Sequence, residues 1–326
     1  MSEAKAIRFD TTGGPEVFYF DTVQVDDPGP GEVRIRQTAI GVNFIDTYHR
    51  TGLYPLPLPS SIGLEAAGVV EAIGAEVLDF AVGDRVAYCS GPVGAYATER
   101  LIPASRVVAL PGLVTDEIAA AAMLKGCTTE MLVERCAKVE AGQTVLVHAA
   151  AGGVGQLLVQ WLRHAGARVI GTAGSDDKAT IAREAGADEV ILYRDEDVAA
   201  SVRELTDGKG VDVVFDGVGA DTWAGSLASL AKRGLLVSYG NASGPVTGVE
   251  LSTLTRHGSL FVTRPTMMDY YATRDEMLTG TTRLLDLIAD GTIVVDIGAK
   301  FALADAAEAH RAMEGRKTMG STILVP

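Results

Sequence analysis

The sequence predicts an α/β protein of two domains: one strand-rich and barrel-like, the other a doubly wound parallel sheet. Three observations support this fold class. The chain has 326 residues, more than a single hydrophobic core usually organises. Up to about residue 125, short β-branched runs are separated by Gly and Pro. From about residue 140 to 262, apolar strand patterns alternate with helical patterns, which is typical of parallel sheets.

In the first domain, a period-two alternation predicts a strand over residues 33–36, and an apolar run ended by glycine predicts another over 68–74. A turn at 83–84 leads into a third strand. Between 116 and 135 the composition changes to Ala, Met, Leu and Glu, which favours a helix and marks the passage to the second domain. We expect the first domain to span residues 1–125, completed by 264–326, and the second to span 126–263.

In the second domain, continuous apolar runs alternate with helical segments. The expected strands are 144–148, 168–171, 189–192, 211–216 and 234–239. The expected helices between them are 155–164, 178–185 and 198–205. A later helix at 281–289 and a closing strand at 321–325 are expected to return to the first domain.

Composition and charge exclude several classes of function. The net charge of −14 repels phosphate backbones and anionic lipid surfaces, so we expect neither nucleic acid nor membrane as a partner. The three cysteines, Cys89, Cys127 and Cys136, match no zinc-binding spacing, so no structural metal is expected. The first residues lack the pattern of a secretory leader, and no apolar stretch reaches the length of a membrane span. These features predict a cytoplasmic protein with reduced thiols.

A glycine-rich turn follows the strand predicted at 144–148 and opens the next helix. It reads Ala149-Ala150-Ala151-Gly152-Gly153-Val154-Gly155, with alanine where the first glycine of the usual G-x-G-x-x-G would stand. Such a turn brings bare backbone N–H groups and the positive end of the helix dipole to a diphosphate. The alternative is an ordinary tight turn, which the strand-helix alternation disfavours. We therefore predict dinucleotide binding by Gly152, Gly153, Val154 and Gly155.

The end of the second predicted strand indicates which dinucleotide binds. A carboxylate there would favour NAD, but the chain reads Gly171-Thr172-Ala173-Gly174-Ser175. Ser175 and Lys178 follow this strand, and Tyr193 and Arg316 are further candidates for the same pocket. A cation can pair with a 2′-phosphate, so NADPH is the expected cofactor. Lys178 could instead be a solvated surface lysine, and Asp176 and Asp177 lie close to it.

Further motifs are spread over nearly the whole chain. In order, they are Gly41-Val42-Asn43-Phe44-Ile45-Asp46-Thr47-Tyr48, Gly52-Leu53-Tyr54-Pro55, Gly63-Leu64-Glu65-Ala66-Ala67-Gly68, Gly83-Asp84-Arg85-Val86, Lys125-Gly126-Cys127-Thr128, Gly240-Asn241-Ala242-Ser243-Gly244, Val262-Thr263-Arg264-Pro265 and Gly315-Arg316-Lys317-Thr318-Met319-Gly320-Ser321. Together they resemble the bacterial NADPH:quinone oxidoreductase and ζ-crystallin branch of the medium-chain dehydrogenase/reductase superfamily. The resemblance implies a GroES-like catalytic domain followed by an NADPH-binding Rossmann domain.

The resemblance also bears on metal chemistry. Zinc-dependent members of the superfamily hold catalytic zinc with a cysteine and with the histidine of Gly-His-Glu. This chain has Asn43 and Leu64 at those positions. Leucine cannot bind a metal and asparagine does so poorly, so no metal is expected and alcohol dehydrogenation is disfavoured.

By the same resemblance, Asn43, Tyr48 and Tyr54 would line the place where nicotinamide meets substrate, and Thr128 and Asn241 would help to seat the cofactor. Plain alternatives are a helix-capping role for Asn43 and ordinary packing for the two tyrosines. A homodimer joined through the Rossmann domains is implied, with edge strands near 260–263 as candidates for the contact.

These observations predict an NADPH:quinone oxidoreductase that transfers hydride without a metal. Orientation of the acceptor and exclusion of water would be the protein's main contributions. A hydrogen-bond donor such as Tyr48, Tyr54 or Asn43 would stabilise the negative charge that develops on the acceptor oxygen. The nearest alternative is an NADPH-dependent reductase of enals or enones, which acts on an activated alkene. A non-enzymatic alternative is a ζ-crystallin-like structural or RNA-binding protein, which the negative charge disfavours.

Overall fold

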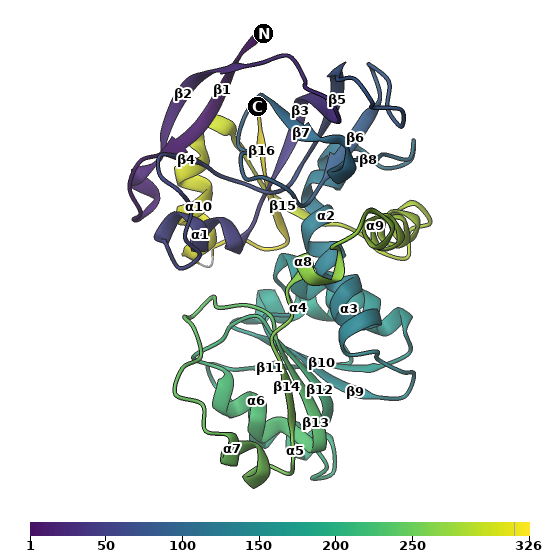
Figure 1. Ribbon diagram of the computed structural model, residues 1–326. Helices are drawn as coiled ribbons and strands as arrows, with labels where there is room; N and C mark the ends of the chain where they lie inside the picture. The colour runs from purple at the N-terminus through teal and green to yellow at the C-terminus, as the bar shows by residue number, and fades with distance from the viewer. Residues whose placement is uncertain (316) are drawn as a thin grey trace. The chain divides into compact units, whose positions relative to one another are not determined.

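The computed structural model describes residues 1–315 and 317–326, and the chain divides into two compact units. Unit 1 comprises Met1–Cys127 and Ala272–Pro326, and unit 2 comprises Thr128–Tyr271. The two chain ends both belong to unit 1 (Figure 1).

These boundaries differ from the expected ones at two places, each with a physical reason. Residues 264–271 belong to unit 2, where the hydroxyl of Tyr271 donates to Glu130 Oε2 at 2.8 Å and Arg135 donates to the Tyr270 carbonyl at 3.0 Å. Gly126 and Cys127, expected in the second domain, belong to unit 1, where Gly126 packs directly on Leu284.

Unit 1 is built on two sheets. Its strands are β1 (Ser2–Phe9), β2 (Tyr19–Val25), β3 (Glu32–Val42), β4 (Ser60–Ser61), β5 (Ala66–Ile73), β6 (Arg85–Tyr88), β7 (Glu99–Pro103), β8 (Val108–Ala109), β15 (Ile297–Ala302) and β16 (Ser321–Val325). The small sheet has the order β2-β1-β4, and the large one runs β15-β16-β3-β5-β6-β8 with β7 paired to β3. Alternate residues of β3, such as Val33 and Ile35, are fully buried, so the period-two prediction is confirmed. The strand-rich character predicted for this domain is confirmed as well.

Four helices lie in the described part of unit 1. They are α1 (Phe44–Thr51), α2 (Asp116–Glu130), α9 (Arg274–Ala289) and α10 (Ala306–Glu314). Short 3-10 turns lie at Pro15–Val17, Ala104–Arg106 and Leu303–Asp305. The last residues of α2 already belong to unit 2, and a π-helical turn, Met131–Cys136, continues the helix there. The helix predicted over 116–135 therefore exists, with a change of hydrogen-bonding pattern near its end.

Unit 2 is a parallel six-stranded sheet. Its strands are β9 (Thr144–Val147), β10 (Arg168–Ala173), β11 (Glu189–Leu192), β12 (Val211–Asp216), β13 (Leu230–Ser238) and β14 (Phe261–Thr263). Their order is β11-β10-β9-β12-β13-β14, and every pairing is parallel, which confirms the predicted doubly wound sheet. The order reverses beside β9, and ligands of such sheets bind at the carboxyl ends of the strands at this point.

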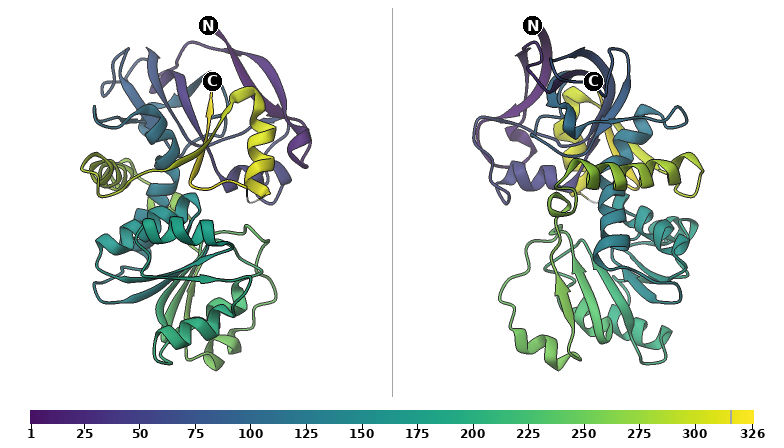
Figure 2. Two further views of the ribbon diagram at one scale, coloured as in Figure 1. Left: turned by 180° about the vertical axis from the view of Figure 1, so that it is seen from behind. Right: turned by 45° about the vertical axis from the view of Figure 1, so that its right-hand side comes forward.

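The helices of unit 2 cover both faces of this sheet. They are α3 (Gly153–His164), α4 (Asp176–Glu184), α5 (Val198–Leu205), α6 (Trp223–Ser229), α7 (Leu251–Arg256) and α8 (Met267–Tyr270). Two views show α3 and α4 on one face and α5 and α6 on the other (Figures 1 and 2). Among the described residues, no helix combines the length and the apolar character that crossing a bilayer requires.

Candidate functional site

The glycine-rich turn joins β9 to α3 in unit 2, as predicted. Ala149 has a positive φ of 52°, and the backbone N–H of Ala150 donates to the Thr172 carbonyl of β10 at 3.0 Å. A Cβ at Gly155 would overlap the carbonyl oxygen of Ala149, so the close packing of the turn on the helix requires glycine there. The turn is therefore compact and is tied to the neighbouring strand.

The start of α3 offers bare backbone to a ligand. Gly152 precedes the first helical residue with extended backbone, and no side chain caps the helix. The N–H groups of the first turn of a helix have no partner within the helix, and the helix dipole adds positive potential at the same place. The residues present thus fit the diphosphate of a dinucleotide, because glycine keeps side chains away from these groups.

The residues predicted for the adenosine end follow the next strand of the sheet. Ser175 directly precedes α4 and is exposed, and Lys178 is half-buried in the first turn of that helix. Tyr193, just after β11, is 40% exposed, and its hydroxyl lies where a Cβ of Gly174 would be. The structure therefore brings Tyr193 to the carboxyl end of β10, beside Ser175. Arg316, the remaining candidate for this pocket, lies outside the described residues.

Asn241 and Thr128 lie on other elements of unit 2. Asn241 is half-buried in the loop after β13, where the chain passes close to the segment after β12. A Cβ at Gly240 would overlap the carbonyl oxygen of Gly217, so the two loops touch through backbone. Thr128 is half-buried near the end of α2.

A buried polar cluster lies beneath the turn. His148 is 3% exposed and contacts the hydroxyls of Thr172 at 3.2 Å and Ser226 at 3.0 Å. Ser226 in turn donates to Asp216 Oδ2 at 2.7 Å. Burial lowers the pKa of His148, and nearby Asp216 opposes this effect. His148 therefore links strands β9, β10 and β12 as a neutral side chain, and the cluster holds the turn in place from below.

In unit 1, the structure brings two of the three predicted catalytic residues together. Tyr48 on α1 and Tyr54 in the following loop are half-buried, and their rings meet edge to face with centroids 5.2 Å apart. His49 also meets Tyr54, at 6.2 Å between centroids. Aromatic pairs of this geometry attract one another and hold each other's orientation. The pair forms an aromatic wall with two hydroxyl groups.

Asn43, the third predicted residue, lies at the start of α1 and is directed inward. Its side-chain Nδ2 donates to Glu65 Oε2 at 2.7 Å, and its backbone N–H donates to Asp46 Oδ2 at 2.9 Å. Oε2 of Glu65 also lies 3.6 Å from Lys125 Nζ, and Oε1 accepts from the backbone N–H of Leu124 at 2.6 Å. Asn43 is thus held by two carboxyl groups, and it also begins the helix that carries Tyr48.

The side chains at the positions of the zinc ligands do not form a metal centre. Leu64 is buried and offers no ligand atom, and Asn43 is bonded to Glu65. In the part of the chain that the structure describes, no three His, Cys, Asp or Glu side chains gather in an arrangement that could hold a metal ion.

A chain of buried hydrogen bonds extends from Asp46. Arg50 Nη1 contacts His310 Nδ1 at 2.9 Å, His310 Nε2 contacts the Tyr96 hydroxyl at 3.0 Å, and this hydroxyl donates to Asp46 Oδ2 at 3.0 Å. Guanidinium can only donate, so Nδ1 accepts and a neutral His310 carries its proton on Nε2. Every bond then points toward Asp46. Arg50 also binds Glu314 at 2.7 Å, so the chain fixes α1 to α10.

The two titratable ends of this chain have shifted pKa values. Burial raises the pKa of Asp46 to about 7, while its hydrogen bonds from Asn43 and Tyr96 act in the opposite direction. Its Oδ1 is buried without a hydrogen-bond partner among the described residues, so a proton on Asp46 sits on that oxygen. Burial, helped by Arg50, lowers the pKa of His310 to about 3.

The sequence analysis did not assign roles to Glu65, Lys125, Asp46 or His310. For Lys125 a signal existed, because it is the lone charged side chain in segment 118–129, which is mostly apolar. A lysine in such a segment is seldom fully buried unless it pairs with an acidic side chain. His310 carried no local signal, since its partners Arg50 and Tyr96 are 260 and 214 residues away in sequence.

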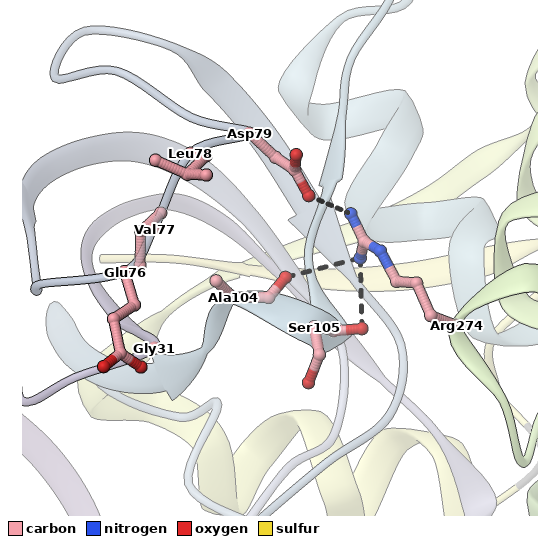
Figure 3. A pocket seen from close by; sticks show the side chains of 8 residues that line it. All are labelled: Gly31, Glu76, Val77, Leu78, Asp79, Ala104, Ser105 and Arg274. Atoms are coloured by element: carbon pink, nitrogen blue, oxygen red, sulfur yellow. Dashed lines mark hydrogen bonds and ion pairs between the residues drawn. The ribbon is translucent and has the colours of Figure 1, made fainter.

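A surface cavity of about 470 Å³ in unit 1 lies apart from these residues (Figure 3). Arg274 on its wall donates to the carbonyls of Ala104 and Ser105 and lies 3.9 Å from Asp79. The guanidinium is thus engaged by the protein itself. None of the predicted site residues that the structure describes lines the cavity.

Comparison with known families agrees with the two units. Residues 29–112 match the family described as alcohol dehydrogenase GroES-like domain, and residues 153–281 match the one described as zinc-binding dehydrogenase. The chain is 52% identical over 324 residues to a quinone oxidoreductase of Pseudomonas aeruginosa, covering 99% of this chain and 100% of that protein. It is 47% identical over 324 residues to a 2-haloacrylate reductase of Burkholderia, covering 96% of both chains.

Solved structures show the same likeness. The structure of Escherichia coli quinone oxidoreductase complexed with NADPH matches with a TM-score of 0.97 and 46% identity, covering 99% of this chain and 100% of the other. The quinone oxidoreductase of Pseudomonas syringae also matches with a TM-score of 0.97, at 52% identity and the same coverage.

Proposed function

The chain belongs to the quinone oxidoreductase family of the medium-chain dehydrogenase/reductase superfamily, and on that premise we propose that it reduces a quinone with NADPH and without a metal. The observation that carries the proposal is the uncapped start of α3, where the first-turn N–H groups of Gly153, Val154 and Gly155 can meet a diphosphate. The N–H of Gly152 already donates to the Ala149 carbonyl at 2.9 Å and shapes the turn instead. The full-length likeness to quinone oxidoreductases supports the choice of acceptor.

In the proposed reaction, bound NADPH supplies a hydride to the quinone. The protein binds the diphosphate through the backbone of the turn and holds the 2′-phosphate with Ser175, Lys178 and Tyr193, to which we add Arg316 from the sequence. We assign Thr128 and Asn241 to seating the rest of the cofactor. Negative charge develops on the quinone oxygen, and the hydroxyls of Tyr48 and Tyr54, with the amide of Asn43, are the groups that we propose to stabilise it.

No general base is needed, because the reduced quinone gains protons instead of losing them. The side chains have to orient the acceptor and exclude water, which is the role that suits an aromatic pair such as Tyr48 and Tyr54. Leu64 and Asn43 stand where zinc ligands would be, which supports a reaction that needs no Lewis acid.

The direct test is NADPH oxidation by the purified protein with a series of simple quinones, measured before and after exhaustive chelation. We expect turnover that chelation leaves unchanged, and binding of NADPH by calorimetry. No heat of NADPH binding would reject the enzyme assignment, whereas activity lost on chelation and restored only by zinc would reject the metal-free mechanism.

The cofactor preference gives a first mutational prediction. Lys178→Glu should raise the Michaelis constant for NADPH roughly 10- to 100-fold, the value of one charge-assisted hydrogen bond, and leave that for NADH nearly unchanged. Lys209→Glu reverses an exposed charge elsewhere on unit 2 and serves as the matched control. Equal effects of K178E on both cofactors would remove Lys178 from the 2′-phosphate pocket.

A second candidate function is reduction of an activated alkene by the same hydride chemistry. The observation that favours it is the 47% identity to a protein named 2-haloacrylate reductase. Turnover of enones and 2-haloacrylates beside quinones, with kcat/KM compared for each, separates the two functions. The preferred substrate class is the one with the larger kcat/KM.

We also propose a homodimer that forms through unit 2. Among the described strands β14 lies at the edge of its sheet with one side unpaired, and Phe261 and Val262 on it are 62% and 37% exposed. Exposed apolar residues on an open edge favour pairing with a second strand, and a twofold contact is the commonest arrangement. We also propose a cytoplasmic location. All three cysteines are free, and Cys89 and Cys127 form no disulfide although their side chains are in contact, which suits a reducing compartment.

A further inference from the structure

Three side chains from separate elements of unit 1 meet in its interior. Asn43 begins α1, Glu65 precedes β5, and Lys125 lies on α2. Their exposed fractions are 6%, 0% and 7%. Glu65 Oε2 is the common partner, 2.7 Å from Asn43 Nδ2 and 3.6 Å from Lys125 Nζ.

A buried ion pair of this kind is weak evidence for stability. The cost of removing two charges from water is of the same size as their attraction, and apolar replacements are often as stable. Backbone surrounds the carboxylate so closely that a Cβ at Gly41 would overlap both Glu65 Oε2 and the Ala120 carbonyl. The pair therefore occupies a space shaped around it, which suggests a role in specifying conformation.

An ionised Glu65 would give the Asn43 amide one orientation. A carboxylate can only accept hydrogen bonds, so it binds the NH₂ end of the amide and turns the carbonyl end away. A neutral carboxylic acid or a glutamine can donate as well, and would bind either end. An ionised Glu65 and the capping box at the start of α1, in which the Asn43 side chain faces the backbone of Asp46, therefore favour the same orientation of the amide.

We propose that Glu65 and Lys125 are positioning residues for quinone reduction: Lys125 keeps Glu65 ionised, and Glu65 fixes the amide of Asn43 in the orientation that turnover requires. The inference rests on the proposed function, which places Asn43 beside the acceptor. Neither Glu65 nor Lys125 has to touch the substrate.

The electrostatic surroundings of Glu65 agree with this division of roles. Burial raises the pKa of Glu65, and Lys125 is the first influence that lowers it, ahead of the Asn43 amide and the Leu124 N–H. Four other titratable groups on the surrounding elements interact electrostatically with the Glu65 carboxylate. They are Asp46 on α1, Tyr88 on β6, Cys89 directly after β6, and Tyr96. Lys125 is the cation in this set, so its removal leaves the carboxyl group with no opposite charge.

Four variants distinguish a positioning role of Glu65 and Lys125 from a purely structural role in the core. They are Glu65→Gln, Lys125→Met, Lys125→Arg and, as the matched control, Lys300→Met, which breaks the exposed Lys300–Glu117 pair of the same unit. For each variant and the wild type, kcat and KM for a simple quinone are measured between pH 6 and 9. NADPH affinity is measured by calorimetry, and folding by circular dichroism.

We expect E65Q to lower kcat roughly 10- to 100-fold at every pH, with NADPH affinity and folding preserved, because a misdirected group costs rate without costing binding. K125M should lower kcat most at low pH and recover toward high pH, where Glu65 ionises without help. K125R should restore both rate and pH profile to within a few fold, and K300M should behave as the wild type.

Four outcomes overturn the proposal: an E65Q variant within twofold of the wild type, a K125M variant whose rate relative to the wild type does not change with pH, no rescue by K125R, or loss of rate that accompanies loss of folding or NADPH affinity. The last would show that the pair only braces the core. A wild type that does not turn over quinones rejects the proposed function instead, so the two failures are distinguishable.

Discussion

Asp46 and His310 are joined through Tyr96, yet they respond to pH in opposite directions. Burial raises the pKa of Asp46 to about 7, so the folded state holds a proton that the unfolded state releases near 3.8. Stability from this group falls as pH rises from about 4 to about 7. Burial lowers the pKa of His310 from 6.5 to about 3, so stability from this group is lost as pH falls across that range.

A substitution separates the two effects. Asp46→Asn keeps the shape of the protonated side chain and cannot ionise, so the free energy of unfolding of the variant relative to the wild type should improve as pH rises from 5 to 8. Urea unfolding at each pH measures this difference. Asp195→Asn, at an exposed aspartate, is the control and should give a difference that does not vary with pH. A constant difference for D46N would show that Asp46 is ionised throughout.

At the level of elements, the turn between β9 and α3 requires glycine at position 155. Gly155→Ala places a methyl group against the Ala149 carbonyl, so it should lower the free energy of unfolding by about 1–3 kcal/mol and weaken NADPH binding at least tenfold. Gly225→Ala is the matched control in α6, where a Cβ has no atom within 4 Å and alanine favours the helix. Calorimetry and thermal unfolding measure both. Equal affinities for the two variants would contradict the proposed role of the turn.

Elements with an apolar buried face could be predicted from the sequence, and elements with a polar buried face could not. The strands around the turn follow apolar runs, and their predicted and observed bounds nearly coincide. Helix α1 was missed because it buries Asp46, Thr47 and Arg50, so its inward face lacks the apolar period that predicts a helix. The hydrogen-bond chain from Asp46 to His310 could not be predicted for the same reason, because its side chains are polar although they are buried.

At the scale of the whole molecule, the open edge of the sheet in unit 2 predicts association. Phe261→Lys puts a charge on an exposed residue of β14, so the fold should persist while the proposed dimer dissociates to a monomer. Light scattering after size-exclusion chromatography measures the mass. Leu113→Lys, at an 81% exposed site of unit 1, is the control and should remain dimeric. If F261K remains dimeric, the dimer does not form through the β14 edge.

The two-domain organisation was predictable because the repeating strand and helix patterns of unit 2 contrast with the punctuated strands of unit 1. The precise boundaries were not, since they depend on contacts between distant residues. Gly126 joins unit 1 through Leu284, and Tyr271 joins unit 2 through Glu130. Composition around these positions is ordinary and carries no such information.

Strand β16 lies between β15 and β3 in the interior of the large sheet, although it is the last strand of the chain. Unit 2, by contrast, is one continuous segment, Thr128–Tyr271. During synthesis on the ribosome, all of unit 2 is therefore made before β16, which pairs with β3. The large sheet of unit 1 can therefore close between β15 and β3 only after segments on both sides of unit 2 have been made.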